Sequence, residues 1–184
     1  MRMGMIAACC LLGLATLAGA QAVGSVATPA AAFDSQMSVI ESEMMGAVKA
    51  MPADKYSFAP SSAAMPAARF DGVRTFVQQV THVAEANFYF YSSLSGLKPD
   101  VDMTKIEGIT NKDEAVAMLA KSFAFAHKAI ATITPENAFV AIKAVDGMDT
   151  RASLAAFGVA HGYDHYGQMV EYLRMNGVLP PGSK

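Results

Sequence analysis

Two histidines four positions apart, His161 and His165, are the residues of this sequence best suited to chemistry. They belong to a row that recurs every three or four residues, and its other members are Leu154, Phe157, Gln168 and Tyr172. Because such a row marks the inward face of a helix, both imidazoles are expected to point into the core. Four residues make just over one helical turn, with a rise of about 6 Å, so both rings can reach one ion. The spacing predicts a pair of metal ligands.

A third candidate ligand, His82, lies in another apolar segment that contains Phe76, Val80, Val83 and Phe90. An imidazole in such surroundings must find a hydrogen bond, ionise into solvent or bind a cation, because burying it unsatisfied costs free energy. A bound metal would satisfy all three rings at once. A purely structural role is the alternative for each histidine taken alone.

The donor set narrows the kind of metal. Three neutral nitrogens without an obligatory carboxylate suit zinc, nickel or copper better than calcium or magnesium. Both cysteines, Cys9 and Cys10, lie in an N-terminal leader, so a closed thiolate zinc site is excluded. A paired-iron site is disfavoured because no glutamate stands beside the histidine pair. Three ligands leave a position for water, whose pKa zinc can lower to about 7.

Four other polar residues are weaker candidates for the surroundings of the ion. Glu85 follows the third histidine by one helical turn, so it is either a residue that orients a ligand or moves a proton, or a solvated side chain. Gln168 lies on the inward row and is expected to support a ligand, whereas Asp164 either does the same or faces water. His127, at the margin of another apolar face, is the alternative fourth ligand.

Four amphipathic segments must position these residues, and apolar spacing, caps and prolines place them at about residues 32–51, 71–97, 111–134 and 149–176. Residues 137–145 read as a short strand or an irregular connection. The pattern predicts an all-α fold, a four-helix bundle over residues 32–181. The Pro-rich loop at 52–69 and the long connection between the third and fourth helices leave a crossover topology open.

Residues 1–22 have the layout of a secretory signal peptide. Arg2 supplies the positive start, an apolar run follows, and small residues precede a cleavage point. A retained anchor is the alternative, although the apolar run is shorter than the ~20 residues of a spanning helix. The leader predicts an exported protein, periplasmic or extracellular, without a stable membrane span after cleavage.

The composition excludes two classes of protein. Of 184 residues, 53% are hydrophobic and 16% charged, which is too apolar for a disordered chain. The formal net charge is −2, so no basic surface is expected and nucleic acid is an unsuitable partner. The length fits a single domain. A homodimer is among the assemblies that the sequence leaves open.

Two segments resemble the signature segments of the DinB-like family of metal-dependent bundles. They are FVQQVTHVAEANFYF and HGYDHYGQMVEYLRMNGVLPP, and KYSFAP at residues 55–60 resembles the loop after that family's first helix. Members are four-helix bundles with one histidine on the second helix and an H-x-x-x-H pair on the last long helix. The resemblance implies that His82, His161 and His165 hold one divalent ion, commonly zinc or nickel, with a position open to water.

Relatives in that family include hydrolases and transferases that use low-molecular-weight thiols. Such thiols are mainly cytoplasmic, so export makes the thiol chemistry less expected here. The leading hypothesis is a metal-dependent enzyme, of hydrolase or transferase type, that acts on a small-molecule substrate. The alternatives are a non-catalytic exported bundle that binds a metal or ligand, and a structural bundle with residual histidines. No sequence feature identifies the substrate or a catalytic residue.

Overall fold

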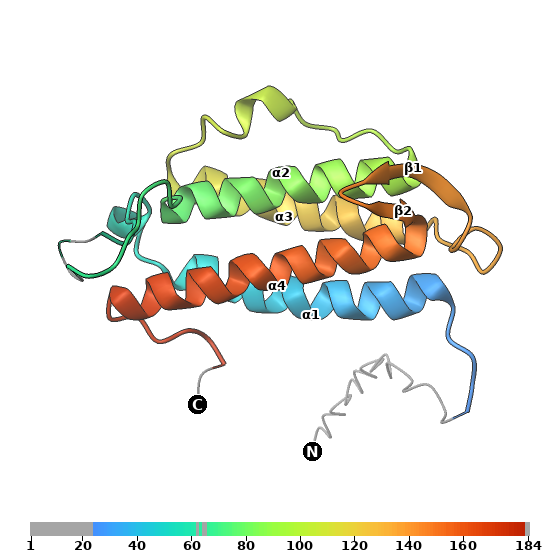
Figure 1. Cartoon of the computed structure of the whole chain (residues 1–184), viewed down its shortest axis with the longest axis horizontal. Helices are drawn as coiled ribbons and strands as arrows, with labels where there is room; N and C mark the ends of the chain where they lie inside the picture. Colours follow the sequence, from blue (N-terminus) through green and yellow to red (C-terminus); the bar gives the residue numbers. More distant parts are fainter. Residues whose placement is uncertain (1–23, 62, 64–65, 183–184) are drawn as a thin grey trace, which may run out of the picture.

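The computed structural model describes residues 24–182 except 62, 64 and 65, so the expected signal peptide at 1–22 lies outside the described residues. Four helices form a bundle (Figure 1): α1 (Pro29–Ala50), α2 (Phe76–Ser95), α3 (Lys112–Ile130) and α4 (Arg151–Met175). The prediction of a helical bundle is confirmed. Within the described residues, no helix combines the length and the apolarity that a membrane span requires.

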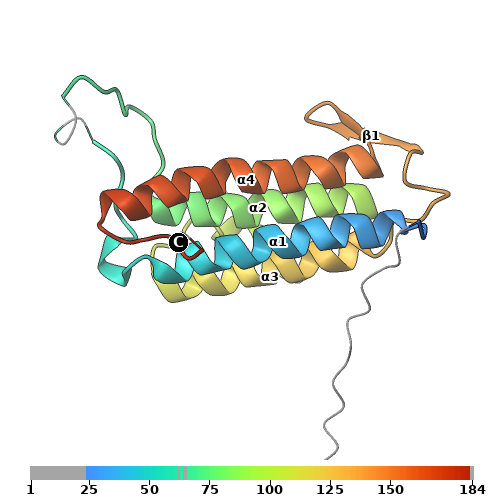
Figure 2. The ribbon, with the colours of Figure 1, turned by 90° about the horizontal axis from the view of Figure 1, so that it is seen from below.

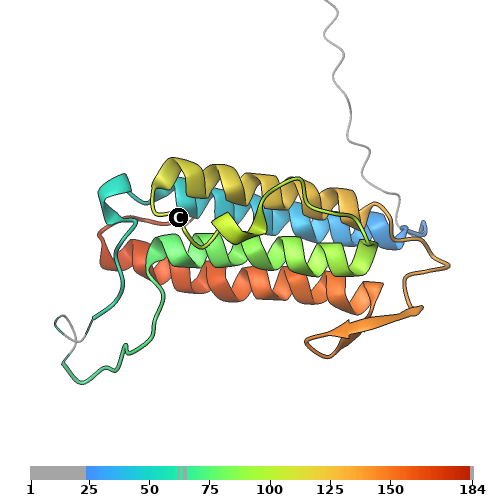
Figure 3. The same ribbon diagram turned by 90° about the horizontal axis from the view of Figure 1, so that it is seen from above.

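The order of the helices includes a crossover. α1 and α2 each pack against both α3 and α4, so α1 and α2 lie diagonally across the bundle (Figures 1 and 2). The neighbours α2 and α3 run in the same direction. They are joined by residues 96–111, which contain the short helix η2 (Met103–Lys105) and pass back over α2 and α3 (Figure 3). The crossover therefore lies between the second and third helices, not in either of the two connections that the sequence pointed to.

The start of α2 shows why the predicted boundary at Asp71 was too early. The Thr75 side chain accepts the backbone N–H of Gln78, and the Gln78 side chain accepts the backbone N–H of Thr75. This reciprocal capping box begins the helix at Phe76. The residues before it form a turn, in which Gly72 has a φ of 79° that favours glycine.

The other helix ends follow similar rules. Asn111 caps α3, because its side chain accepts the N–H of Glu114. A second capping box, between Thr150 and Ser153, begins α4. α1 begins at Pro29, three residues earlier than predicted, and α3 ends at Ile130, before the predicted stop at 134–135. Pro29 suits the first helical position of α1. Near the predicted end of α3, the residue before Pro135 disfavours helical geometry.

The predicted loop after α1 contains the short helix η1 (Ala53–Lys55) and holds the ends of two helices. The carbonyls of Phe58 and Tyr56 accept the first N–H groups of α2, from Phe76 at 2.8 Å and Val77 at 2.9 Å. The buried Tyr56 hydroxyl donates to the Val48 carbonyl of α1. Because helix termini leave backbone groups unpaired, this segment satisfies groups that would otherwise need water.

A hairpin precedes α4, so the segment 137–145 contains a short strand at residues 141–145, preceded by a turn at 137–140. Strands β1 (Ala141–Val145) and β2 (Met148–Thr150) pair antiparallel. Asp146 and Gly147 join them with φ values of 49° and 84°. Positive φ at both positions is typical of the two-residue Asp-Gly hairpin turn. Figure 1 shows this turn pointing back along the bundle beside α2 and α4.

Two glycines bring α4 close to its neighbours. A Cβ atom at Gly158 would lie 2.5 Å from the hydroxyl oxygen of Tyr91 on α2, and one at Gly162 would lie 3.0 Å from Ile40 on α1. Larger residues at these positions would push the helices apart. The close approach occurs beside His161, so it helps to bring α4 within reach of α2.

Candidate metal centre

The three predicted ligands converge between α2 and α4. The Nε2 atom of His161 lies 3.3 Å from Nε2 of His82 and 3.2 Å from Nε2 of His165. Each histidine offers one ligand atom, and the three atoms lie within 4.8 Å of one another. Two nitrogens that are each about 2.0–2.1 Å from a tetrahedral zinc ion lie about 3.4 Å apart. The two measured separations fit that geometry.

The orientation of His165 is set by a chain of hydrogen bonds. Its Nδ1 lies 2.6 Å from Oε1 of Gln79, whose amide donates to Oε1 of Gln168 at 2.7 Å. The Gln168 amide in turn donates to the carboxylate of Asp164 at 3.0 Å. Because a carboxylate only accepts, each amide must turn its oxygen toward the histidine. Nδ1 of His165 therefore carries the proton, and Nε2 keeps a free lone pair.

His161 strengthens the case for a cation at the centre of the cluster. Its Nδ1 is buried and has no hydrogen-bond partner in the described part of the chain, so the polar contacts of this ring run through Nε2. Its Nε2 faces two other ring nitrogens, and a single proton on it can serve only one of them. A metal ion would satisfy the three facing lone pairs at once, so the residues present fit such an ion.

The surroundings keep the three imidazoles neutral. Burial lowers the pKa of His82 to about 4, and the charges of Arg74 and His161 add to this effect. Burial also lowers the pKa of His165 to about 4, with smaller contributions from the other two imidazoles, and burial lowers the pKa of His161. A metal ligand must be deprotonated. At neutral pH the three rings are therefore in the form that binds metal.

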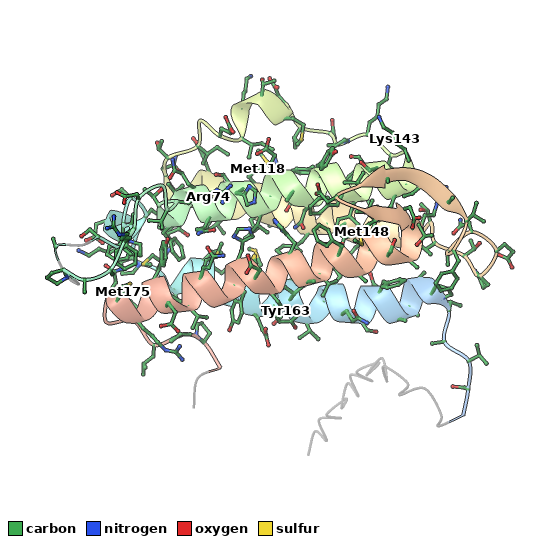
Figure 4. The ribbon with its side chains drawn as sticks, viewed as in Figure 1. Arg74, Met118, Lys143, Met148, Tyr163 and Met175 are labelled. Carbon is green, nitrogen blue, oxygen red and sulfur yellow. The ribbon has the colours of Figure 1, made fainter. Side chains whose placement is uncertain are left out.

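Two cavities adjoin the cluster and share His82 and Glu85 in their walls. The aromatic cavity, of about 350 Å³, is also lined by Tyr89, Phe90, Met103, Asp146, Phe157 and His161. The polar cavity, of about 520 Å³, is also lined by Arg74, Gln78, Thr81 and Glu107. Figure 4 places Arg74 near the start of α2. Glu85 thus lies beside His82 where a small molecule in either cavity would meet the cluster.

Sequence reasoning overlooked Gln79, which is 2% exposed and contacts His165 directly. Gln79 lies one turn before His82, so helix spacing places both on the same face of α2. This spacing was the sequence feature that could have identified it. Gln168, predicted to support a ligand, acts through Gln79 instead. Tyr172, in the same row, is buried, and its hydroxyl donates to the Arg74 carbonyl at 2.9 Å.

Replacing Gln79 by leucine should weaken metal affinity by about 10–100-fold, the usual cost of losing a partner behind a ligand. The leucine leaves the Nδ1 proton of His165 without an acceptor, so the ring loses its fixed orientation. One equivalent should still bind at saturating metal. Competition with a chelator measures the affinity, and Gln36→Leu on the exposed part of α1 is the control. Equal affinities for both variants would contradict the role assigned to Gln79.

The structure does not bring His127 to the cluster. Its Nδ1 lies 2.5 Å from an Asp34 carboxylate oxygen and its Nε2 lies 3.1 Å from a Glu41 carboxylate oxygen, so it joins α3 to α1. Burial lowers the pKa of His127, but the two carboxylates outweigh it and the pKa is raised. Both nitrogens can donate only in the imidazolium form. His127 is an ion-pair residue rather than the fourth ligand.

This ion pair predicts a pH dependence of stability. Because the folded-state pKa of His127 is raised above 6.5, its stabilisation is complete below pH 6.5 and is lost as pH rises through the folded-state pKa. In chelator, the melting temperature of His127→Gln should fall below that of the unaltered chain at about pH 6. The difference should shrink by about pH 9. A difference that grows with pH would contradict this assignment.

Comparison with known proteins agrees with this architecture. The family model of the DinB superfamily matches residues 36–169, which include all four helices in part or whole and the three clustered histidines. A search of curated proteins found no match. The match covers well over half of the 184 residues. The chain therefore belongs to the DinB superfamily.

Proposed function

We propose that this protein is an exported metal-dependent enzyme that holds one zinc or nickel ion through His82, His161 and His165. Its reaction is of hydrolase or transferase type on a small molecule. The observation that carries the proposal is the convergence of three neutral Nε2 atoms at the junction of two cavities. An ion held there supplies a Lewis acid and lowers the pKa of bound water to around 7.

Residues of the chain supply the remaining functions. Gln79 holds His165 in the tautomer that leaves Nε2 free. The Glu85 carboxylate lines both cavities, so it is placed to take a proton from, or return one to, a molecule bound in either. Phe90 and Phe157 pack around His161 at ring separations of 5.3 and 6.4 Å and limit the access of water on that side.

Metal should raise the melting temperature, because it ties α2 to α4 and binds only the folded arrangement. An ion at about one hundred times its Kd adds about 2.7 kcal/mol. For a domain of this size, that corresponds to a rise of about 5–10 °C. Calorimetry with metal and with chelator makes the measurement, and His161→Ala should show no difference between the two. Equal melting temperatures for the unaltered chain would contradict an occupied site.

Turnover is tested separately, because a non-catalytic metal-binding bundle would give the same melting curves. Metal-loaded protein is assayed against a panel of small esters, amides and activated transfer substrates, and each active substrate is retested with Glu85→Gln. We expect activity that His161→Ala removes and Glu85→Gln lowers. A chain that binds one equivalent of metal but turns over none of the panel would favour the non-catalytic alternative.

A further inference from the structure

We propose that the small molecule bound beside the histidines is an organic cation, an amine or ammonium compound with an apolar body, and that it occupies the aromatic cavity. This inference deepens the proposed function and rests on it for the reaction that follows binding. It is carried by the walls of the cavity, by the sign of the charges around it and by the constrained backbone at one of those charges.

The walls favour an apolar body. Phe90 and Phe157 meet edge to face with ring centroids 5.3 Å apart, and Tyr89 adds a ring 5.8 Å from Phe90. Tyr89 is 54% exposed, although it is a large aromatic residue, and it lies at the cavity together with the thioether of Met103. Aromatic faces attract cations as well as apolar groups, and such cages bind quaternary ammonium ions.

The charges around the cavity are negative. Carboxylates enter its wall from two separate elements, Glu85 on α2 and Asp146 in the hairpin turn. Among the described residues that line it, none is lysine or arginine. The lysine of the adjacent strand, Lys143, points away from the bundle (Figure 4). No salt bridge neutralises Glu85 or Asp146 within the described part of the chain, so both charges are available to a cationic ligand.

The hairpin turn fixes the backbone that carries the second carboxylate. Asp146 has a φ of 49°, which few residues other than glycine, asparagine and aspartate adopt readily. The two-residue turn leaves little backbone freedom at this position. Both turn residues are exposed, and the hairpin stands off the outer side of α4 (Figures 2 and 3). Asparagine tolerates the same backbone conformation. Asp146→Asn therefore removes the charge and keeps the turn.

The polar cavity provides a contrast on the other side of His82. Its lining includes Arg74, which attracts anions, and Glu107, a carboxylate that the aromatic cavity lacks. Together with the shared Glu85 this gives the polar cavity a mixed lining of one positive and two negative charges, whereas the charged residues that line the aromatic cavity are negative only. Glu107→Gln is a matched control, because it removes one negative charge near the cluster without changing the aromatic cavity.

At about 350 Å³, the aromatic cavity is at the small end of ligand sites.

The probe is benzyltrimethylammonium, whose nitrogen has no lone pair and cannot bind the metal. Titration calorimetry on the full chain, metal-loaded and again in chelator, compares it with benzyl alcohol and with benzoate, which share the aromatic ring but are neutral and anionic. The chelator arm removes the bond that the oxygen atoms of these two compounds can form with a bound ion. We expect the cation to bind several-fold more tightly than the alcohol. Benzoate should bind more weakly than the cation. Benzoate binding more tightly than the cation in chelator would overturn the proposal.

The variants then locate the probe. Glu85→Gln and Asp146→Asn should each weaken cation binding about threefold, and together about tenfold, the range of partly exposed charge pairs. Neither variant should change the affinity for benzyl alcohol. Glu107→Gln should leave the affinity for the cation unchanged. An equal loss in Glu107→Gln, or no loss in the double variant, would overturn the proposal.

Metal content is measured on every sample, and this separates the two proposals. A chain that binds one equivalent of metal but shows no preference for the cation contradicts the substrate class alone. A chain that binds no metal contradicts the proposed function. In that case the calorimetry still tests the cavity, since neither the probe nor the two carboxylates requires the ion.

Discussion

Alanine at any one of His82, His161 or His165 should abolish stoichiometric metal binding. Each substitution leaves only two nitrogens in the cluster, and His82 is the only ligand that α2 contributes. Two imidazoles seldom hold a transition metal against competition from buffer and chelator. Elemental analysis of protein purified without a polyhistidine tag makes the measurement. We expect about one equivalent in the unaltered chain and a small fraction of that in each variant.

Three further variants show whether the loss is specific. His127→Ala should keep one full equivalent, because His127 lies between α1 and α3 and pairs with Asp34 and Glu41. Glu85→Ala and Gln168→Ala should keep the stoichiometry and at most weaken affinity by about 10–100-fold. If His82→Ala retained the metal and His127→Ala lost it, α3 rather than α2 would complete the site and the assignment would be wrong.

Gly158→Ala should lower the free energy of unfolding by about 1–3 kcal/mol, the usual cost of inserting a methyl group into a packed core. The new Cβ would lie 2.5 Å from the hydroxyl oxygen and 2.8 Å from Cζ of Tyr91. Tyr91 is fully buried and donates to the Ala155 carbonyl at 3.2 Å, so it has little room to move. Alanine's better helix propensity offsets only part of this cost. Urea denaturation in chelator measures the change.

The same substitution at Gly167, on the same helix, is the matched control. Nothing lies within 4 Å of a Cβ built there, and the residue is exposed. Gly167→Ala should therefore stabilise the chain by up to about 1 kcal/mol, because alanine is the better helix former. Effects of the same sign at both positions would show that propensity, not the contact with Tyr91, governs Gly158.

The histidine cluster was largely readable from the sequence because its signal is local. His161 and His165 are one turn apart, so their shared direction follows from helix geometry alone. His82 is different, since no rule of spacing says which helices become neighbours. The family resemblance supplied that link. Gln79 was missed because a glutamine in a helix usually faces solvent, and only the packing of α2 against α4 shows that it meets His165.

The fold was predictable in kind but not in arrangement. Periodicity located four helices, while their starts depended on caps such as the Thr75 box, which overrode the apolar pattern. The crossover lies in the connection at 96–111, because side-chain packing across the whole bundle determines which helices become neighbours. The Asp146-Gly147 pair was an available hairpin signal. Its importance became visible only when the turn was found in the wall of a cavity.

The position of the cluster in the chain also bears on the rate at which the protein folds. His82 and His161 are 79 residues apart, and the parallel pair α2 and α3 must be joined by a connection that spans the bundle. Contacts between such distant segments form slowly, because a long loop must close before they bring any gain. The three nitrogens therefore meet only when α4 packs against α2, which is a non-local step of folding. A metal ion that binds only this non-local arrangement is expected to slow unfolding more than it speeds folding.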